Sequence, residues 1–399
     1  MSANANLPTK ILIVDDDPAI AQGLEEPLGR YKIAVLKATT LETAYYQFNQ
    51  HRLDVVVVES GFAPLSGLAL IQKWRNHDVV EKRATAFIVT TGTQRTPAED
   101  GLIRELGDLE VIAKPFNAIN ILPYLSRGLG AKQRALAFDE MKSRLVEPWV
   151  KHGNLDKAVE QVQKKVTEIG PKAMYLLYDL YEKAGKYDQA LGIVDQVLDR
   201  DTNNIALISA KARLYMRTGK IAEARDLFER ADKVAPDNIE RINEMVGLYL
   251  RVREPDASVR KMKELIALTP ENPDLKFEMF SKLYDHGFDS HAVEFGRATS
   301  KPMEIVRHYN NKGVLLSKSG NSAGAVTEYQ RALQFFPKFK ENYRILYNIA
   351  LAKSALKTPD AVREAILCLE QCLQLEPEFD KAKKALETLT KLATPKKAV

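Results

Sequence analysis

Cysteine is scarce in this chain: Cys368 and Cys372 are the only two among 399 residues, and four positions separate them. A disulfide framework needs more cysteines, and a metal site on this pair would need another cysteine or a nearby histidine, which the sequence does not provide. We therefore expect two small, buried and reduced thiols, as in a cytoplasmic protein.

Long apolar runs and long runs of one charge are also missing. No stretch approaches the roughly 18 to 20 apolar residues of a membrane-spanning helix, and the start, MSANANLPTK, lacks the apolar segment of a secretory signal. The net charge is only +5, and the one basic cluster of note is the pair Lys396-Lys397 near the end. These features predict neither a membrane span nor nucleic acid as an obligatory partner.

Motifs of known catalytic sites are absent as well. No histidine pairs with a serine or cysteine at a recognisable nucleophile elbow, and no glycine-rich loop that could hold a phosphate is found. The histidines are scattered along the chain and are expected on the surface: His51, His77, His152, His286, His291 and His308. We predict that the protein is not an enzyme and requires no cofactor.

A repeat fills about two thirds of the chain. Small residues recur at intervals of 32, 34, 34, 34, 33 and 40 residues. Fixed periods of this length indicate stacked helical units rather than a single globular core. The recurring positions are Ala158, Ala190, Ala224, Ser258, Ala292, Ala325 and Ala365.

Other positions repeat together with the small residue. In the most regular copy, Tyr215 is followed by Gly219, Ala224, Phe228 and Pro236. The glycine can end a first helix in a left-handed conformation, the alanine lets a second helix approach closely, and the proline marks that helix's end. A hairpin of this kind cannot bury its apolar face alone, so neighbouring copies must stack. The region resembles the tetratricopeptide repeat, which implies an all-α superhelix.

The array is predicted to span residues 131–379 as about seven helical hairpins. Its copies are irregular at both ends and within residues 239–272, where Arg253 replaces the turn glycine and Pro255 follows. Residues 380–399 are predicted to form an amphipathic capping helix and a tail, because solenoids need a polar end.

Residues 1–130 have a different pattern, in which short apolar runs alternate with helical segments. Unbroken valine and isoleucine runs are typical of strands that a parallel sheet buries on both faces. We predict a doubly wound α/β domain with a five-stranded parallel sheet, followed by a short linker at Gly128–Gly130. The expected strands are Ile11–Val14, Ile33–Leu36, Val55–Val58, Phe87–Val89 and Glu110–Ile112.

Polar residues follow the predicted strands in a recognisable order. Asp15 and Asp16 follow the first strand, Thr91 closes the fourth, and Lys114 follows the fifth. These residues resemble those of the CheY-like receiver domain of two-component response regulators. The resemblance implies two acidic residues that hold Mg²⁺, an aspartate after the third strand that accepts phosphate, and threonine and lysine contacts to the phosphoryl group.

One position departs from that family. Glu59 stands where the phosphate-accepting aspartate belongs, and Gly67 supports this register eight residues later. An acyl phosphate on Glu59 would lie one methylene group too far out, so we expect no efficient phosphotransfer. Val111 also replaces the aromatic residue that rotates with the threonine in the family, so the switch is predicted to be damaged twice.

Three interpretations of Glu59 stay open. It could reach Lys114 and lock the domain in one conformation, or it could be a structural remnant in a docking surface. Alternatively, some metal or phosphoryl chemistry could remain, for which Ser60 is a candidate residue. Asp15, Asp16 and Glu59 could still bind Mg²⁺ weakly, because three unpaired carboxylates in one cleft would otherwise repel each other.

A groove for a partner is predicted on the first helices of the hairpins. Basic residues on three adjacent copies would form a stripe that fits an acidic or carboxylate-ended segment. The competing interpretation is that these residues are solvated and merely suit the helix C-termini. The groove residues are Lys183, Arg213, Arg217, Asn243 and Arg251.

These features together predict a cytoplasmic, bacterial signalling adaptor in which a pseudo-receiver is joined to a partner-recruiting array. A homodimer through the receiver-like domain would be compatible with this prediction. The alternatives are a response regulator switched by phosphorylation or metal with the array as its output, and a chaperone or assembly factor.

Overall fold

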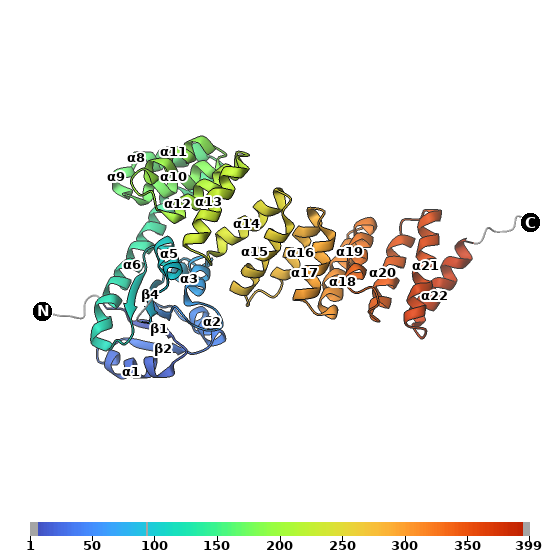
Figure 1. The fold of residues 1–399 in the computed structure, drawn as a ribbon, viewed down its shortest axis with the longest axis horizontal. Helices are drawn as coiled ribbons and strands as arrows, with labels where there is room; N and C mark the ends of the chain where they lie inside the picture. The colour runs from blue at the N-terminus through green and yellow to red at the C-terminus, as the bar shows by residue number, and fades with distance from the viewer. Residues whose placement is uncertain (1–6, 93–94, 394–399) are drawn as a thin grey trace, which may run out of the picture. The chain divides into compact units, whose positions relative to one another are not determined.

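The computed structural model describes residues 7–92 and 95–393 of the chain, which form two compact units (Figure 1). The first unit comprises Met1–Val252 with Arg260–Pro270, and the second comprises Arg253–Val259 with Glu271–Val399. The first unit contains an α/β domain together with the beginning of a helical array. The second unit is wholly helical in its described residues.

The α/β domain is built on a parallel five-stranded sheet with the order β2-β1-β3-β4-β5. Both this sheet and the helical region that follows confirm the predicted fold class (Figure 1). The strands are β1 (Lys10–Val14), β2 (Ala34–Ala38), β3 (Val55–Glu59), β4 (Ala86–Thr91) and β5 (Glu110–Ala113).

Helices cover both faces of the sheet, so successive strand residues enter two different cores. Val56 and Val58 belong to one hydrophobic cluster and Val55 and Val57 to the other, and all four are buried. This is why β3 is a continuous valine run rather than an alternating pattern. The helices of the domain are α1 (Pro18–Gly29), α2 (Leu41–Gln50), α3 (Gly67–Arg75), α4 (Val80–Arg83), α5 (Pro97–Leu106) and α6 (Ala118–Leu145).

Helix α6 connects the α/β domain to the array without a break. It runs for 28 residues and passes through Gly128–Gly130, so the predicted linker at this point is wrong. A helical glycine costs only about 1 kcal/mol relative to alanine, which tertiary packing can offset. The small residue also suits close packing here, because a Cβ on Gly128 would lie 3.2 Å from Cγ2 of Val55. The glycine marks close packing rather than a boundary.

The array continues as helices that pair along the chain. In the first unit these are α7 (Glu147–Lys151), α8 (Leu155–Lys164), α9 (Val166–Ile169), α10 (Lys172–Lys183), α11 (Tyr187–Leu198), α12 (Ile205–Arg217), α13 (Ile221–Val234) and α14 (Ile239–Arg251). Helix α15 (Pro255–Leu268) has residues in both units. In the second unit follow α16 (Leu275–Asp285), α17 (Asp289–Thr299), α18 (Pro302–Lys318), α19 (Ser322–Phe335), α20 (Asn342–Ser354), α21 (Pro359–Leu375) and α22 (Asp380–Ala393).

The turns within the hairpins use a left-handed residue, as the repeat pattern predicts. Gly219 has a φ of +83° between α12 and α13. Arg253 takes the same role after α14 with a φ of +64°, although a side chain makes this conformation cost roughly 1 to 2 kcal/mol. Its guanidinium lies 4.6 Å from the centre of the Phe288 ring and donates a hydrogen bond to the carbonyl oxygen of His286. These contacts offset part of the strain.

Candidate functional site

The acidic and basic residues predicted from the sequence meet at one edge of the sheet. Asp15 and Asp16 follow β1, Glu59 ends β3, and Lys114 follows β5. Because β1 and β3 are neighbouring parallel strands, their carboxyl ends lie side by side, which is where sheets of this kind bind ligands. Gly67 allows this loop to fold back, since a Cβ there would lie 2.1 Å from the carbonyl oxygen of Glu59.

Lys114 bridges two carboxylates in this site. Its Nζ lies 2.7 Å from Oδ2 of Asp15 and 2.6 Å from Oε1 of Glu59. Asp15 is only 3% exposed, whereas Asp16 is exposed. One ammonium group therefore compensates two negative charges that would otherwise repel each other.

The surroundings of these groups change their proton affinity. Burial raises the pKa of Glu59, the hydrogen bond from Lys114 opposes this, and the charge of Asp15 raises it further. Burial by itself would lower the pKa of Lys114, but its hydrogen bonds to Asp15 and Glu59 outweigh this effect and raise it. Both shifts are consistent with a tightly coupled group of charges.

The same residues could hold a divalent cation. Asp15, Asp16 and Glu59 each offer a carboxylate oxygen, and these oxygens lie within 4.8 Å of one another. Oxygen ligands of this type suit Mg²⁺. The second carboxylate oxygen of Glu59 is buried and accepts no hydrogen bond, so it has free capacity for a ligand. The donor set therefore fits Mg²⁺, although Lys114 already neutralises part of its charge.

The two predicted switch positions lie on the neighbouring strands. Thr91 ends β4, is buried, and its carbonyl oxygen accepts a hydrogen bond from the backbone N–H of Lys114 at 2.8 Å. Val111 pairs with Val89 in the ladder between β4 and β5 and packs, half-buried, against the core on one face of the sheet. This valine thus fills hydrophobic space and offers no hydroxyl or aromatic ring to the site.

The predicted basic stripe on the array is partly neutralised within the protein. Arg213 Nη1 lies 2.8 Å from Oε1 of Glu240. Burial by itself would lower the pKa of Arg213, but the charge of Glu240 helps to raise it. Burial raises the pKa of Glu244, and the nearby charges of Arg213 and Arg217 only partly oppose this rise. The stripe is therefore a mixed surface, because acidic residues of α14 lie among its cations.

The remaining stripe residues lie apart from this ion pair. Arg251 is exposed and donates from Nη1 to the carbonyl oxygen of Met216 at 3.1 Å. Lys183, Arg217 and Asn243 are also exposed. A solvated position near a helix C-terminus, the competing interpretation from the sequence, describes Lys183 and Arg217 well.

The array docks onto the α/β domain through helices that sequence reasoning did not single out. Helix α5 contacts both α12 and α13. A single hydrophobic cluster joins Leu68 of α3 and Leu102 of α5 to Ile208 of α12 and Ala231 of α13. Gly101 permits the close approach, since a Cβ on it would lie 2.1 Å from the carbonyl oxygen of Val234.

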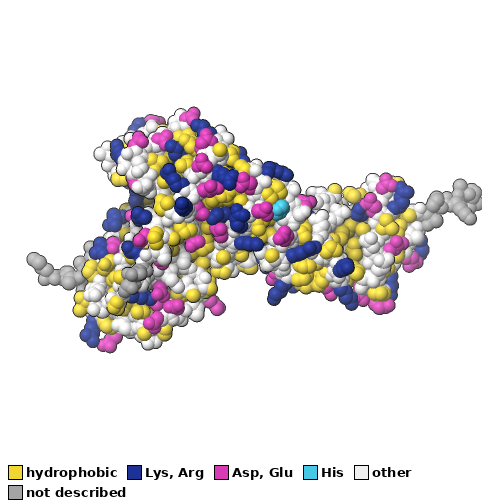
Figure 2. Space-filling model, viewed as in Figure 1, with side chains coloured by type: hydrophobic (Ala, Val, Ile, Leu, Met, Phe, Trp, Pro, Cys, Tyr) yellow, Lys and Arg dark blue, Asp and Glu magenta, His cyan; other side chains and the backbone are white. Residues whose placement is uncertain are grey.

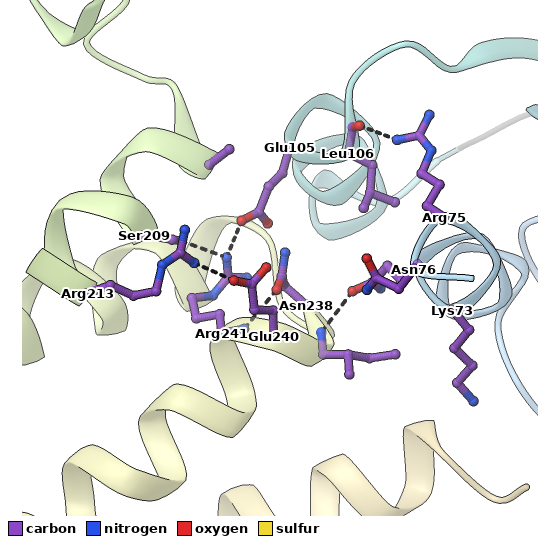
Figure 3. A pocket seen from close by; sticks show the side chains of 13 residues that line it. Lys73, Arg75, Asn76, Glu105, Leu106, Ser209, Arg213, Asn238, Glu240 and Arg241 are labelled. Carbon is purple, nitrogen blue, oxygen red and sulfur yellow. Dashed lines mark hydrogen bonds and ion pairs between the residues drawn. The ribbon is translucent and has the colours of Figure 1, made fainter. Parts of the chain in front are cut away.

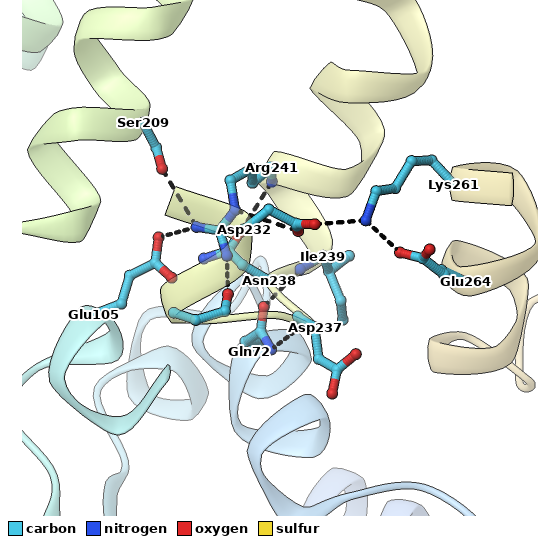
Figure 4. A network of polar contacts seen from close by, with 11 residues as sticks. Gln72, Glu105, Ser209, Asp232, Asp237, Asn238, Ile239, Arg241, Lys261 and Glu264 are labelled. Atoms are coloured by element: carbon cyan, nitrogen blue, oxygen red, sulfur yellow. Dashed lines mark hydrogen bonds and ion pairs between the residues drawn. The ribbon is translucent and has the colours of Figure 1, made fainter. Parts of the chain in front are cut away.

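A buried ion pair lies at the edge of this interface (Figure 4). Arg241 at the start of α14 is fully buried, and its Nη1 lies 2.6 Å from Oε1 of Glu105 on α5. The guanidinium also donates to Oγ of Ser209 at 3.3 Å and to the carbonyl oxygen of Ala235. Asp232 lies 3.7 Å from its Nε and is itself paired with Lys261 at 2.6 Å. These contacts compensate a charge that water does not reach.

Gln72 of α3 makes a second polar connection between the two parts. Its Nε2 donates to the carbonyl oxygen of Asp237 at 2.9 Å, and its Oε1 accepts from the backbone N–H of Ile239 at 2.8 Å. The amide therefore caps backbone groups at the start of α14 with both of its ends, which fixes the helix against α3.

A pocket of about 290 Å³ opens beside these contacts (Figure 3). Its lining combines Arg75, Arg213 and Arg241 with Glu105 and Glu240. These charges largely pair with one another or with backbone carbonyls, as the dashed lines in Figure 3 show. The pocket is accordingly a seam of the interface. With Lys73, its lining holds more basic than acidic residues, although most of these charges are engaged within the protein.

Two features of the sequence could have revealed the docking. Leu207 and Leu275 lie one 34-residue period before and after Arg241, so an arginine occupies a position that neighbouring copies give to leucine. Gly101 interrupts an otherwise good helical pattern, and an interior helical glycine often indicates close packing. Neither feature identifies the partner surface by itself.

Charges of both signs are mixed on the face of the molecule drawn in Figure 2, where Lys and Arg side chains lie among Asp and Glu side chains. Within residues 7–92 and 95–393, none of the helices has the length and apolar character needed to cross a membrane.

Comparison with known proteins identifies two families in separate parts of the chain. Residues 11–126 match the response regulator receiver domain, and residues 181–247 match the tetratricopeptide repeat. The response regulator GtcR of Aneurinibacillus migulanus is 27% identical over 136 residues, which cover 34% of this chain and 52% of that protein. A BBSome complex member BBS4 homolog of Drosophila melanogaster is 22% identical over 199 residues, covering 46% of this chain and 40% of that protein.

The chain thus spans about half or less of the length of these curated relatives. Among solved structures, a tetratricopeptide repeat protein of Parabacteroides merdae is 16% identical, covers 64% of this chain and 99% of its own, and gives a TM-score of 0.35. From the matched residues, the chain contains a response regulator receiver domain at 11–126 and tetratricopeptide repeats at 181–247.

Proposed function

We propose that this protein is a non-enzymatic signalling adaptor whose receiver does not relay phosphate and whose array recruits a protein partner. The observation that carries the proposal is the Lys114 bridge between Asp15 and Glu59, with glutamate at the position that accepts phosphate in the receiver family. In this arrangement the lysine already pairs with the carboxylate to which a phosphoryl group would have to be attached.

The chemistry of Glu59 supports this function. A phosphoryl group attached to its longer side chain would extend beyond the position that Lys114 and the metal-binding carboxylates are placed to stabilise. Phosphoryl transfer depends almost entirely on positioning and charge stabilisation, so a displacement of this size is costly. The ion pair instead holds a negative group beside Lys114 permanently.

The interface between receiver and array supports an adaptor rather than a switch. The hydrophobic cluster that includes Leu102, Ile208 and Ala231 is continuous across the two parts. A change of state in the receiver that moved α5 would have to open this cluster and the buried Arg241–Glu105 pair. The receiver then acts as a fixed element beside the array, and the repeats remain available for a protein partner.

The proposal is tested by phosphorylation of the full chain. The protein is incubated with acetyl phosphate and Mg²⁺, and the intact mass is measured. We expect no phosphoryl adduct on the wild-type protein or on Glu59→Gln. A stoichiometric acid-labile adduct on the wild-type protein would overturn the proposal.

Glu59→Asp serves as the positive control. It restores the shorter acceptor while leaving Asp15, Asp16 and Lys114 in place, and it is expected to gain an adduct. Partner binding by this variant, with and without acetyl phosphate, then separates a locked receiver from a purely structural one. A locked receiver predicts altered binding in at least one state.

A metal-switched regulator is a second candidate. It is favoured by the three convergent carboxylates and by the Glu59 oxygen that accepts no hydrogen bond. Under this alternative, Mg²⁺ alone would change the affinity of the full chain for its partner. Under the leading proposal, Mg²⁺ has no such effect.

A further inference from the structure

A second groove on the array differs from the mixed surface around Arg213. In the second unit, a pocket of about 380 Å³ lies between α18 and α20 and extends to Phe379 and Lys381, where α22 begins. Alternate helices of the stack, the first of each hairpin, therefore line it. Its volume lies within the range of about 300 to 1,000 Å³ that is usual for ligand pockets.

The lining of this groove carries positive charge only. Arg307 of α18, Arg344 of α20 and Lys381 of α22 contribute cations, and no aspartate or glutamate belongs to the lining. Arg344 has a neighbouring partner in Glu341 at 3.1 Å. In the part of the chain that the structure describes, Arg307 and Lys381 are exposed and form no ion pair. Two cations from different helices thus remain available to a ligand.

An amide pair on the groove wall suits a peptide backbone. Asn348 Nδ2 donates to Oδ1 of Asn310 at 2.7 Å. This bond orients both side chains. It leaves the side-chain N–H groups of Asn310 and the side-chain carbonyl oxygen of Asn348 for other partners. A donor and an acceptor are therefore presented together, as the C=O and N–H groups of an extended chain require.

Apolar side chains complete the groove between the cations. Val306 is buried, and the rings of Tyr347 and Phe379 meet edge to face with centroids 5.1 Å apart. Met303 at the rim is 40% exposed, and its flexible thioether adapts to apolar ligands of different shape. The groove thus offers apolar contacts flanked by positive charge.

We infer that the groove lined by Arg307, Asn310, Tyr347, Asn348 and Lys381 binds an extended acidic segment of a partner protein. The charge of the lining selects acidic side chains or a terminal carboxylate, the amide pair holds the backbone, and the apolar floor takes an intervening apolar side chain. This inference rests on the proposed recruitment of a protein partner, and it names the chemistry of that partner. It also places the binding site in the second unit rather than on the stripe near Arg213.

Peptide binding to the full chain tests the inference. The probes are three fluorescein-labelled octapeptides of alternating pattern, in which leucine alternates with glutamate, with glutamine or with lysine. In fluorescence anisotropy, the glutamate peptide is expected to bind about tenfold or more tightly than the glutamine peptide. The glutamate carboxylates are attracted to the cations of the lining, whereas the neutral glutamine side chains are not. Equal binding of the glutamate and glutamine peptides would overturn the inference, as would tighter binding of single-stranded DNA of equal charge.

Matched variants separate the groove from general electrostatic attraction. Arg307→Glu with Lys381→Glu is expected to weaken binding of the glutamate peptide about tenfold or more through like-charge repulsion. Lys183→Glu with Arg217→Glu makes the same change of charge at exposed positions outside the groove lining and is expected to change binding less than about twofold, because salt screens general attraction between exposed charges. Equal losses in both variants would contradict a site at this groove.

Asn348→Leu tests recognition of the backbone without a change of charge. It is expected to reduce affinity severalfold while thermal unfolding stays within a few degrees of the wild type; unchanged affinity would overturn the role of the amide pair. The outcome is independent of the phosphorylation experiment. Loss of the groove prediction leaves the phosphate-inert receiver intact, whereas a phosphoryl adduct on the wild type overturns the proposed function and leaves the groove intact.

Discussion

The guanidinium of Arg241 and the carboxylate of Glu105 lie 2.6 Å apart, although 136 positions separate the two residues in the sequence. Arg241 is fully buried, and the Glu105 side chain is 4% exposed. Burial raises the pKa of Glu105 despite the opposing hydrogen bond and charge of Arg241. The pair is therefore held in place by the surrounding fold at a considerable desolvation cost.

Removing one member of this pair should weaken the first unit strongly. Arg241→Ala leaves Glu105 buried without its cation, which is expected to lower the free energy of unfolding by about 3 to 5 kcal/mol. The chain has two tryptophans, Trp74 and Trp149, and both lie in the first unit. Urea unfolding followed by tryptophan fluorescence therefore reports on this unit in the full chain.

The double variant Arg241→Met with Glu105→Leu provides the control. Apolar replacements of similar volume remove both charges together and should recover most of the lost stability. If Arg241→Ala alone cost less than about 1 kcal/mol, the buried pair would not be an essential part of the interface.

Adding a methyl group at Gly101 should separate the receiver from the array. Gly101→Ala would place a Cβ 2.1 Å from the carbonyl oxygen of Val234, and a backbone atom cannot move away cheaply. We expect a loss of about 1 to 3 kcal/mol, as for overpacking in a core, together with faster proteolysis. Gly23→Ala in α1 is the matched control, because no atom lies within 4 Å of its added Cβ. The control should be stabilised by about 0.5 to 1 kcal/mol, and a similar gain at Gly101 would disprove the close contact.

Asp54 should make the stability of the receiver sensitive to acid. Its Oδ2 accepts hydrogen bonds from the backbone N–H and hydroxyl of Thr9 at 2.7 and 2.9 Å, and Lys132 of α6 lies 3.0 Å from Oδ1. Burial by itself would raise the pKa of Asp54, but Lys132 and Thr9 outweigh it and lower the pKa below 3.8. A carboxyl group whose pKa is lower in the folded than in the unfolded state stabilises the fold at pH values above its unfolded-state pKa. This contribution is lost as the pH falls through its folded-state pKa.

Asp54→Asn tests this dependence. At neutral pH the variant should lose about 1 to 3 kcal/mol of unfolding free energy, the range for hydrogen bonds to a charged group. The difference from wild type should shrink as the pH falls below 3.8. Glu26→Gln, which removes an exposed ion pair with Arg30, should show neither effect, because exposed pairs contribute little. A pH-independent loss at Asp54 would mean that packing, not charge, stabilises this contact.

Removing the ammonium group from the receiver site should create a dependence on Mg²⁺. Lys114→Ala leaves Asp15 and Glu59 without their shared cation, so like charges should lower stability by about 1 to 3 kcal/mol at neutral pH. Mg²⁺ can replace the lost charge and should restore the melting temperature, since binding to the folded state alone adds about 2.7 kcal/mol at a hundredfold excess over its Kd.

The wild-type protein should respond less to Mg²⁺, because Lys114 already neutralises the site. Lys132→Ala, which removes the partner of Asp54, should be destabilised without any rescue by the metal. Equal shifts of melting temperature with Mg²⁺ in wild type and Lys114→Ala would show that the lysine and the metal do not compete.

Local chemistry made the main elements predictable from the sequence. The valine run of β3 is typical of a strand buried on both faces, and the recurrence of Gly219 and Ala224 at fixed spacing predicts hairpins. The residues around Glu59 could be placed in one site because the carboxyl ends of parallel strands meet. Each of these predictions depends on neighbouring positions in the chain or on a rule that holds for all such sheets.

Contacts between elements that lie apart in the sequence were not predictable in this way. Gly128 resembles a linker residue, yet it lies inside α6 and packs closely against the side chain of Val55. Arg213 and Glu240 are far apart in sequence, so their pairing depends on how two hairpins stack. Such features arise from tertiary packing, which no single-residue preference encodes.

The two attachments of the receiver have a consequence for cooperativity. Helix α6 leads from the sheet into the array, and α5 contacts the array again at α12 and α13, so the chain between these points forms a closed circuit of contacts. An open stack of repeats can lose its hairpins one at a time from an end. In a closed circuit, the hairpins of α7 to α11 have no free end from which to unravel. They should therefore melt together with the receiver in one transition, and partial unfolding should begin in the repeats beyond Pro270.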